Sequence, residues 1–437
     1  MGACDTIREN QKRGYPLVAD WPLHEGDVRN FDWGSSTEQI DLLTGGGAPC
    51  QPFNMGGKHK AHDENRDMFP ATVENVKGLT RASFSSYFQY IQFQLEFPEV
   101  KRRKNETWFD HLVRLQTEHT SGRLHSKGLA YNIIPTLVNA ANYGIPQKRE
   151  RIFLVGFRSD LGVDWSFPKE THSQTALLRD QWITGQYWER HNVARKDRPA
   201  APANLASLER GASQTLLFES HRPWRTIRDA LVGLPDPKSK AAREYRDHKF
   251  QQGAKVYPGH TGSPIDQPSM TLKAGDHGVP GCENMLVDNN GAPRYLSIRE
   301  AARVQTFPDG CAFHGSWTET LRQLGNAVPV VLGHVVARSV AEALIAKDMA
   351  DLSKQQRRLR GVACARPATS SRLTRSNASI SVQASLRRCY PKRRSGWWSF
   401  RASTGPVSTR STTSAISRLM LRWLRQTEMT SSTSPFM

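Results

Sequence analysis

Paired cysteines are absent from this sequence of 437 residues. Its six cysteines are scattered, and no two have the Cys-x-x-Cys spacing of a structural zinc site or a redox motif. This excludes a fold built on a disulfide framework, and it leaves room for a single reactive thiol.

Long apolar runs are also missing. No stretch approaches the roughly 18 to 20 unbroken apolar residues needed to cross a bilayer, and the N-terminus has no charged-then-apolar signal segment. We therefore expect a soluble, intracellular protein with no membrane partner. The length is enough for two or three domains with a sizeable core.

Acidic residues are scarce near the C-terminus. Residues 351–437 contain 17 of the 60 Lys and Arg residues but only two acids, Asp351 and Glu428. The net charge of +19 is therefore mostly a property of this tail, and the remaining chain is nearly balanced. A balanced core can still bind DNA through a local basic stripe, so composition neither proves nor excludes DNA binding.

Two common catalytic motifs are missing. There is no Gly-x-Ser-x-Gly, and Gly45–Gly47 is not followed by Gly-Lys-Ser/Thr, so a serine hydrolase or P-loop enzyme finds no support. The trio His59, His62 and Asp63 has no second ligand cluster and lies in a polar stretch. We interpret it as surface histidines and predict no metal site.

Four regions follow one another along the chain. Residues 1–165 alternate apolar runs with Gly/Pro turns, as an α/β domain should. Residues 166–290 are polar and interrupted by prolines, which indicates an inserted recognition domain. Residues 291–349 return to helix. Residues 350–437 are rich in Arg, Ser and Thr, and we expect disorder there. The alternatives for this tail are a non-specific DNA-binding arm and a gene end read out of frame.

Local patterns predict individual elements. Apolar residues crowd in 131–138 and 151–157, and the second run has the look of a buried strand. Ser297 and Glu300 have the spacing of a capping box, which predicts a helix start. Further helices are expected near residues 3–10 and 330–346.

Cys50 lies in the most informative motif. An apolar run feeds Gly45–Gly47, and then Pro49 and Pro52 stiffen the loop around Cys50 and Gln51. A cysteine fixed after a strand lies where open α/β sheets place their chemistry. An inert buried cysteine is the alternative.

Three weaker motifs follow Cys50. Glu74-Asn75-Val76 places an acid after a short apolar run, which alone is more typical of a solvated surface. Gln147–Arg151 is a charged run that leads directly into the 152–157 strand, and alternation would point Arg149 and Arg151 to one side. Gly325–Pro329 is the last, and alone it reads as a turn after a capped helix.

In this order, these segments resemble the cytosine-C5 DNA methyltransferase family. The resemblance covers most of residues 1–345 and fails in the tail. It implies an α/β, Rossmann-like S-adenosylmethionine-dependent methyltransferase sheet with a smaller target-recognition domain at about 166–290. It also implies a C-terminal part, 291–349, that completes the catalytic domain.

The resemblance implies a mechanism on a cytosine flipped out of double-stranded DNA. The thiolate of Cys50 would add to C6, and C5 would take a methyl group from S-adenosylmethionine. Glu74 would hydrogen-bond the flipped base and favour its protonation at N3. Arg151 and Arg149 would stabilise negative charge and hold the base.

Further site residues are also carried over by resemblance. The cofactor S-adenosylmethionine would be held by Asp27, Pro49, Asn326 and Val328, while positions near DNA would be Gln147, Thr271 and Arg303. The chain is expected to act as a monomer. A restriction endonuclease that cuts the same site is the implied partner within a restriction-modification system.

Two departures from the family pattern bear on activity. The opening Phe-x-Gly-x-Gly strand and turn, and the next strand with its acid, are not found, which indicates a family member shortened at its N-terminus. Only residues 70–73 lie between Asn65–Phe69 and Glu74, too few for a parallel crossover of about a dozen residues. The alternative function is therefore a catalytically inactive relative that at most binds DNA.

Overall fold

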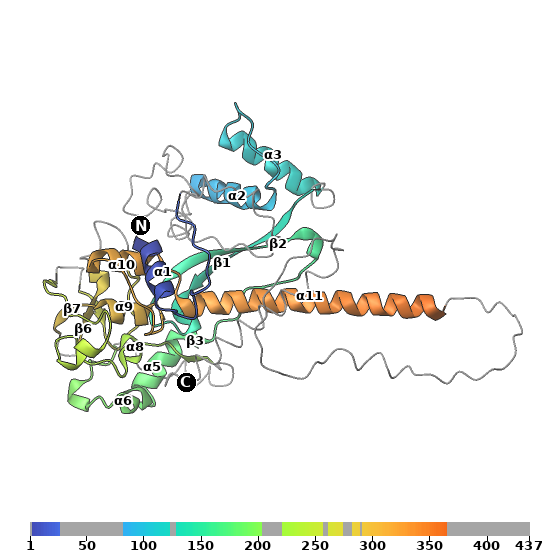
Figure 1. Cartoon of the computed structure of the whole chain (residues 1–437). Helices are drawn as coiled ribbons and strands as arrows, with labels where there is room; N and C mark the ends of the chain where they lie inside the picture. The colour runs from blue at the N-terminus through green and yellow to red at the C-terminus, as the bar shows by residue number, and fades with distance from the viewer. Residues whose placement is uncertain are drawn as a thin grey trace, which may run out of the picture. The chain divides into compact units, whose positions relative to one another are not determined.

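A computed structural model describes residues 2–26, 82–122, 128–202, 221–256, 261–273, 282–288 and 291–364. The chain divides into two units, Met1–Val340 and Ala341–Met437, and the first holds the elements discussed below except the last helix, which begins in the first unit and continues into the second (Figure 1). Cys50 and Glu74, with the strand expected at 41–44, lie outside the described residues, and so do residues 365–437.

A long antiparallel ribbon runs through the first unit (Figure 1). Strand β1, Tyr131–Asn139, pairs with β2, Glu150–Arg158, over their whole lengths. The two predicted strands are therefore confirmed. The expectation of a buried β2 was wrong, because its residues are half-buried except Phe157 and two exposed positions. An antiparallel ribbon needs only a short connection, and here it includes the 3₁₀ turn η3, Ala140–Tyr143.

Two helices form a small core of their own. Helix α2, Ala82–Glu96, packs against α3, Trp108–Ser121. A capping box begins α3, since Thr107 accepts a hydrogen bond from the amide of Asp110 and the Asp110 carboxylate accepts one from Thr107. The buried apolar residues between these elements are Tyr90, Phe93, Phe97, Leu112, Leu115 and Ala130.

Short elements occupy the region predicted to recognise the target. Its helices are α5, Gln174–Trp182; α6, Gln186–Arg190; and α8, Ile227–Leu231. Its strands are β3, His172–Ser173; β4, Arg222–Pro223; β5, Ser263–Pro264; and β6, Met285–Val287. Its single 3₁₀ turns are η5, Arg195–Asp197; η6, Ala241–Glu244; and η7, Cys282–Asn284, while η4, Ser159–Leu161, directly follows β2. The domain boundaries at 165 and 290 stay predictions.

The largest core lies around two C-terminal helices. Strand β7, Pro293–Tyr295, pairs with β6, and α9, Ile298–Val304, and α10, Trp317–Asn326, follow. The predicted capping box of Ser297 and Glu300 is confirmed at the start of α9. Fully buried members of this core include Leu286, Leu296, Ala301, Val304, Leu321 and Leu324.

The N-terminal helix is tied to this core. Helix α1, Gly2–Lys12, confirms the helix expected near residues 3–10. The buried Asn10 amide donates to the Ala312 carbonyl at 2.7 Å, and its oxygen accepts from the Ala312 amide at 2.9 Å. Thr6 donates to the side-chain oxygen of Gln323 at 2.8 Å.

The last described helix is longer than expected. Helix α11 runs Val330–Cys364, so it confirms the helix predicted at 330–346 and corrects the disorder predicted from 350. Residues 351–364 are rich in Leu, Arg, Gln, Lys and Ala, which are good helix formers and sustain a helix without an apolar period.

One helical stretch passes a length and composition test for crossing a membrane. It lies within Trp317–Arg357 and has a mean hydropathy of 1.6 over its best window. The core helix of a globular protein passes the same test. In the first unit, Leu332 of α11 is buried with Val138 and Ile145, and 22% of the hydropathic window is buried.

In the part of the chain that the structure describes, sheets have two or three strands. Helices and strands mix along this part, as in an α/β protein. The Rossmann-like sheet of the sequence interpretation stays a prediction.

Candidate functional site

Half of the predicted catalytic and cofactor positions lie outside the described residues. These are Cys50 and Glu74 for catalysis, and Asp27 and Pro49 for the cofactor. Their roles stay predictions. The described part of the candidate site is formed by the other motif residues, which come from three segments far apart in the sequence.

The first two segments meet through main-chain hydrogen bonds. The amide of Ser269 donates to the Pro146 carbonyl at 2.9 Å, and the amide of Lys148 donates to the Ser269 carbonyl at 2.8 Å. The Thr271 hydroxyl adds a bond to the Lys148 carbonyl at 2.8 Å. Gln147 and Ser269 thus form a parallel bridge, which joins the predicted catalytic run to the element predicted near DNA.

Gln147 lies inside this bridge. Its side chain has no exposed surface, and among the described residues neither its amide nitrogen nor its amide oxygen has a hydrogen-bond partner. An unpaired buried amide costs about 1–3 kcal/mol. In this arrangement Gln147 faces the interior, and its predicted contact with DNA stays a prediction.

Arg149 connects the first segment to the third. It is 4% exposed, and its guanidinium donates to the Gly325 carbonyl at 2.7 Å. Gly325 belongs to the last turn of α10, where main-chain carbonyls lack helical partners and carry partial negative charge. A buried cation is therefore placed against a group of the opposite sign.

The same turn is held from a second side by residues that the sequence did not single out. The side chain of Gln305 is fully buried and donates to the Leu324 carbonyl at 2.7 Å. The main-chain carbonyl of Gln305 accepts from the amide of Val330 at 3.1 Å. Gln305 thus fixes both the end of α10 and the beginning of α11.

Thr306 also binds this turn, and Arg149, Gln305 and Thr306 together are called the clamp. Its hydroxyl accepts from the amide of Val331 at 3.0 Å, which satisfies a donor in the first turn of α11. The φ of Thr306 is 59°, a rare conformation for a β-branched residue. Such backbone strain is kept where the surroundings over-determine it, often at functional sites. The only sequence signal was its position directly after a capped helix.

Between the two clamped ends, the turn presents its side chains outward. Asn326 is exposed, and Val328 is 45% exposed. An amide and an apolar group side by side on a fixed turn suit a ligand that has both polar and apolar parts. This donor set is compatible with S-adenosylmethionine, as far as the described residues extend.

The remaining basic residues of the first segment differ in depth. Lys148 is exposed with its ammonium 5.6 Å from the centre of the Trp224 ring, and partial burial lowers the pKa of Lys148. Arg151 is half-buried at the start of β2 and donates to the Glu150 carbonyl at 2.8 Å. Arg149 and Arg151 therefore do not share an environment, although they were expected to share a side.

Arg303, predicted to lie near DNA, makes internal contacts. It donates to both carboxylate oxygens of Asp309, at 2.9 and 2.6 Å, and to the Val232 carbonyl at 2.8 Å. Burial alone would raise the pKa of Asp309, but these bonds from Arg303 hold it below its usual value. Arg303 fastens the end of α9 in this structure, and its contact with DNA stays a prediction.

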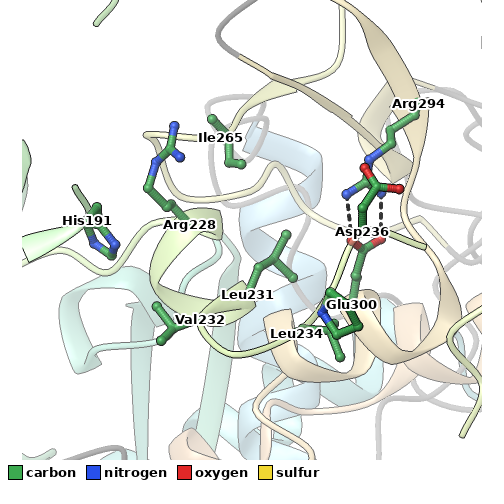
Figure 2. A pocket seen from close by; sticks show the side chains of 10 residues that line it. His191, Arg228, Leu231, Val232, Leu234, Asp236, Ile265, Arg294 and Glu300 are labelled. Carbon is green, nitrogen blue, oxygen red and sulfur yellow. Dashed lines mark hydrogen bonds and ion pairs between the residues drawn. The ribbon is translucent and has the colours of Figure 1, made fainter. Parts of the chain in front are cut away.

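A cavity of about 310 Å³ lies elsewhere, in and beside the region predicted to recognise the target (Figure 2). Its charged side chains are already partnered. Arg228 binds Asp266, Arg294 binds Glu300, and the imidazole of His191 lies 2.9 Å from a carboxylate oxygen of Asp229. Among the described residues, no cluster of His, Cys, Asp and Glu could hold a metal ion.

Comparisons with known proteins agree on one family. The sequence profile described as C-5 cytosine-specific DNA methylase matches residues 3–96 and 114–342. The chain is 28% identical over 356 residues to the type II methyltransferase M.Eco47II of Escherichia coli, covering 78% of this chain and 72% of that protein.

A second relative covers more of its own length. The type II methyltransferase M.NgoMIV of Neisseria gonorrhoeae is 28% identical over 359 residues, which cover 78% of this chain and 88% of that protein. Among solved structures, the Dnmt2 methyltransferase of S. pombe matches with a TM-score of 0.29 and 17% identity, covering 52% of this chain and 62% of that chain. A TM-score this low gives no support for a shared topology.

Proposed function

Because the chain belongs to the C-5 cytosine-specific DNA methylase family, whose members are enzymes, we propose that it methylates C5 of a cytosine in a specific duplex site. Relatives named type II methyltransferases support a place in a restriction-modification system, with an endonuclease of the same specificity as partner. We propose a monomer that acts in the cytoplasm.

One structural observation carries the proposal beyond family membership. The predicted catalytic run, the element predicted near DNA and the predicted cofactor turn are joined by hydrogen bonds at residues 146–149, 269–271 and 324–325. Segments that serve one reaction must be held in one geometry. Because these three segments are joined, a working methyltransferase is favoured over an inactive relative that keeps the sequence motifs but has lost the arrangement of the site.

The proposed reaction begins with a cytosine flipped out of the duplex, because its reacting edge is inaccessible in the stack. The Cys50 thiolate forms a bond from Sγ to C6, and the electron pair of the C5–C6 double bond becomes available at C5. Glu74 holds the base and favours its protonation at N3. Arg151 stabilises the charge that develops on the base.

S-adenosylmethionine, when bound, supplies the methyl group that C5 takes. The C5 proton then leaves to a base, the C5–C6 double bond forms again, and Cys50 is released as the thiolate. The residues of this chain proposed to hold the cofactor are Asp27, Pro49, Asn326 and Val328. The last two project from the clamped turn.

The test is transfer of label from methyl-labelled S-adenosylmethionine to mixed-sequence genomic DNA, with Cys50→Ala as the control. We expect label in DNA with the natural chain and none with the variant. Circular dichroism establishes that both proteins are folded. Absence of label with the folded natural chain would overturn the proposal in favour of a relative that binds DNA without methylating it.

A further inference from the structure

Arg149 stands at the point where the predicted catalytic run meets the cofactor turn. We propose that Arg149 is a positioning residue for the turn at 324–331, and that the base is left to Arg151. This inference rests on the proposed function, because it concerns how the same site is assembled.

The direction of the Arg149 guanidinium is the first support. The side chain is 4% exposed and its Nη2 donates to the Gly325 carbonyl at 2.7 Å. A group that stabilises charge on a flipped base must meet that base at an open surface. Arg151 is only half-buried, so of these two arginines it has the more exposed side chain and is the one that can meet the base.

The architecture of the turn is the second support. Arg149 holds the Gly325 carbonyl, Gln305 holds the Leu324 carbonyl, and Thr306 holds the amide of Val331. Asn326 and Val328 therefore project from a turn fixed at both ends. Removing the guanidinium would leave the α10 end of the turn held by Gln305 alone and would make the position of these two side chains less well defined, which is how a distant residue weakens ligand binding.

The experiment compares Arg149→Met with Arg151→Met. Methionine keeps the unbranched apolar stem of arginine and removes the charged guanidinium with its donors. For Arg149→Met we expect about tenfold or greater loss of S-adenosylmethionine affinity in equilibrium dialysis, with kcat at saturating cofactor changed only a few-fold. For Arg151→Met we expect the reverse: loss of kcat with cofactor affinity nearly unchanged.

Duplex DNA affinity without cofactor and the thermal midpoint are measured in parallel. A local role predicts that neither changes much in Arg149→Met. Guanidinium ion added to Arg149→Ala should recover part of the cofactor affinity. The proposal is overturned if Arg149→Met keeps cofactor affinity and loses kcat, since Arg149 would then act on the base.

Amide hydrogen exchange separates this inference from the proposed function. Loosening the turn should accelerate exchange at Ala327, Val330 and Val331 in Arg149→Met, even without cofactor. If the natural chain binds no cofactor, the proposed function fails while exchange still decides the positioning role. Unchanged exchange overturns that role. Should Arg149→Met not fold, Gln305→Met removes the neighbouring bond to the same turn and is measured in its place.

A second observation, independent of the first, is a run of four cations between α2 and α3. Lys101, Arg102, Arg103 and Lys104 are all exposed. Among the described residues, no acid side chain forms an ion pair with any of the four. The nearby carboxylate of Glu106 is instead paired with Arg114 at 2.7 Å.

This run, the basic loop, is held in a defined shape. The amide of Arg103 donates to the Glu106 carboxylate at 2.8 Å, and the Arg102 side chain donates to the Glu106 carbonyl at 2.7 Å. From α3, Arg114 donates to the Lys101 carbonyl at 2.9 Å. A fixed backbone that displays unneutralised cations loses little entropy when it meets an anion.

We infer that the basic loop contacts the phosphates of duplex DNA without reading its sequence. Phosphate contacts position a protein on the duplex and make binding depend on salt. The four side chains are changed to glutamine together. The control changes four cations that are exposed or half-buried and already paired with acids, namely Arg8, Arg158, Arg322 and Lys347.

Affinity for a mixed-sequence duplex without cofactor is measured over a range of salt concentrations. Each lost phosphate contact lowers the slope of log K against log salt by about 0.9, so the basic-loop variant should lose about 2 to 4 in slope. The control should lose less than about 1. An equal loss in both variants, or no loss in the basic-loop variant, overturns the inference.

Discussion

Glu300 offers a quantitative test of how the core around α9 is held. Its carboxylate is 2% exposed and accepts from the amide of Ser297 at 2.8 Å and from both terminal nitrogens of Arg294, at 2.7 and 2.6 Å (Figure 2). Glutamine in its place keeps the shape but removes the charge, and its amide would turn a donor toward a donor. Breaking such a buried pair costs about 3–5 kcal/mol. We expect Glu300→Gln to lower the free energy of unfolding by about 3 kcal/mol.

The pair and the helix cap can be separated with a double-mutant cycle. Ser297→Ala removes the cap bond and should cost only about 1 kcal/mol, plus the loss of the Ser297 contact to the ring of His248 at 2.8 Å. For the cycle, Glu300 is changed to leucine and Arg294 to methionine. Arg294→Met alone leaves a buried carboxylate without its cation, and Glu300→Leu alone leaves a guanidinium without its carboxylate, so the two should cost about the same. The double variant of Arg294 and Glu300 should cost clearly less than the sum of its parts.

Urea unfolding, followed by circular dichroism and tryptophan fluorescence, measures these free energies. Trp317 is a suitable reporter, because its indole donates to the Leu296 carbonyl beside α9 at 3.1 Å. An interaction energy between positions 294 and 300 of less than about 0.5 kcal/mol would refute the reasoning. That result would mean that water or another group satisfies the carboxylate when Arg294 is removed.

Four further predictions test other parts of the fold. Leu321→Ala, in the fully buried core, should cost about 3–5 kcal/mol in the same unfolding assay. Gly144→Ala should lower the thermal midpoint, because φ is +81° and an added Cβ would lie 2.6 Å from the ring of His172. Burial, and then neighbouring arginines, lower the pKa of His172 from 6.5 to about 4; the unfolded chain binds the extra proton, so stability should fall as pH drops from about 6.5 to 4, and His172→Gln should flatten that dependence. In Arg114→Met, an NMR titration should show the pKa of Glu106 rising from about 2 toward its ordinary range, since the side-chain bond from Arg114 is its largest cause.

Local chemistry explains which elements could be predicted from the sequence. The capping box at Ser297 and the helix after it depend on bonds three residues apart, so the sequence pattern was enough. The strands at 131–139 and 150–158 were also found from a local pattern, because each contains a run of apolar residues. Their pairing was not predicted, because apolar residues on both faces suggested a buried parallel strand. The ten residues between Asn139 and Glu150 are too few for a parallel crossover, and this length was the overlooked signal.

The candidate site was harder to predict, because the bonds that join its three segments connect residues more than a hundred positions apart. The motifs identified Arg149 and Asn326 as candidates, but no local pattern indicates that Arg149 binds a carbonyl 176 residues away. Gln305 and Thr306 were missed as clamp residues because they bind main-chain groups, and such a contact leaves no complementary side chain to recognise in the sequence.

Within the charged run at 147–151, the burial of each side chain, rather than its residue type, distinguishes the residues. Gln147 and Arg149 point into the protein, Lys148 is exposed, and Arg151 lies between these extremes. A buried guanidinium is stable only where opposite charge replaces lost water, and the carbonyl end of α10 provides it. Lysine could not substitute, because its compact and strongly hydrated ammonium loses more on burial than a delocalised guanidinium. The carbonyl end of α10 therefore accounts for a buried arginine at position 149.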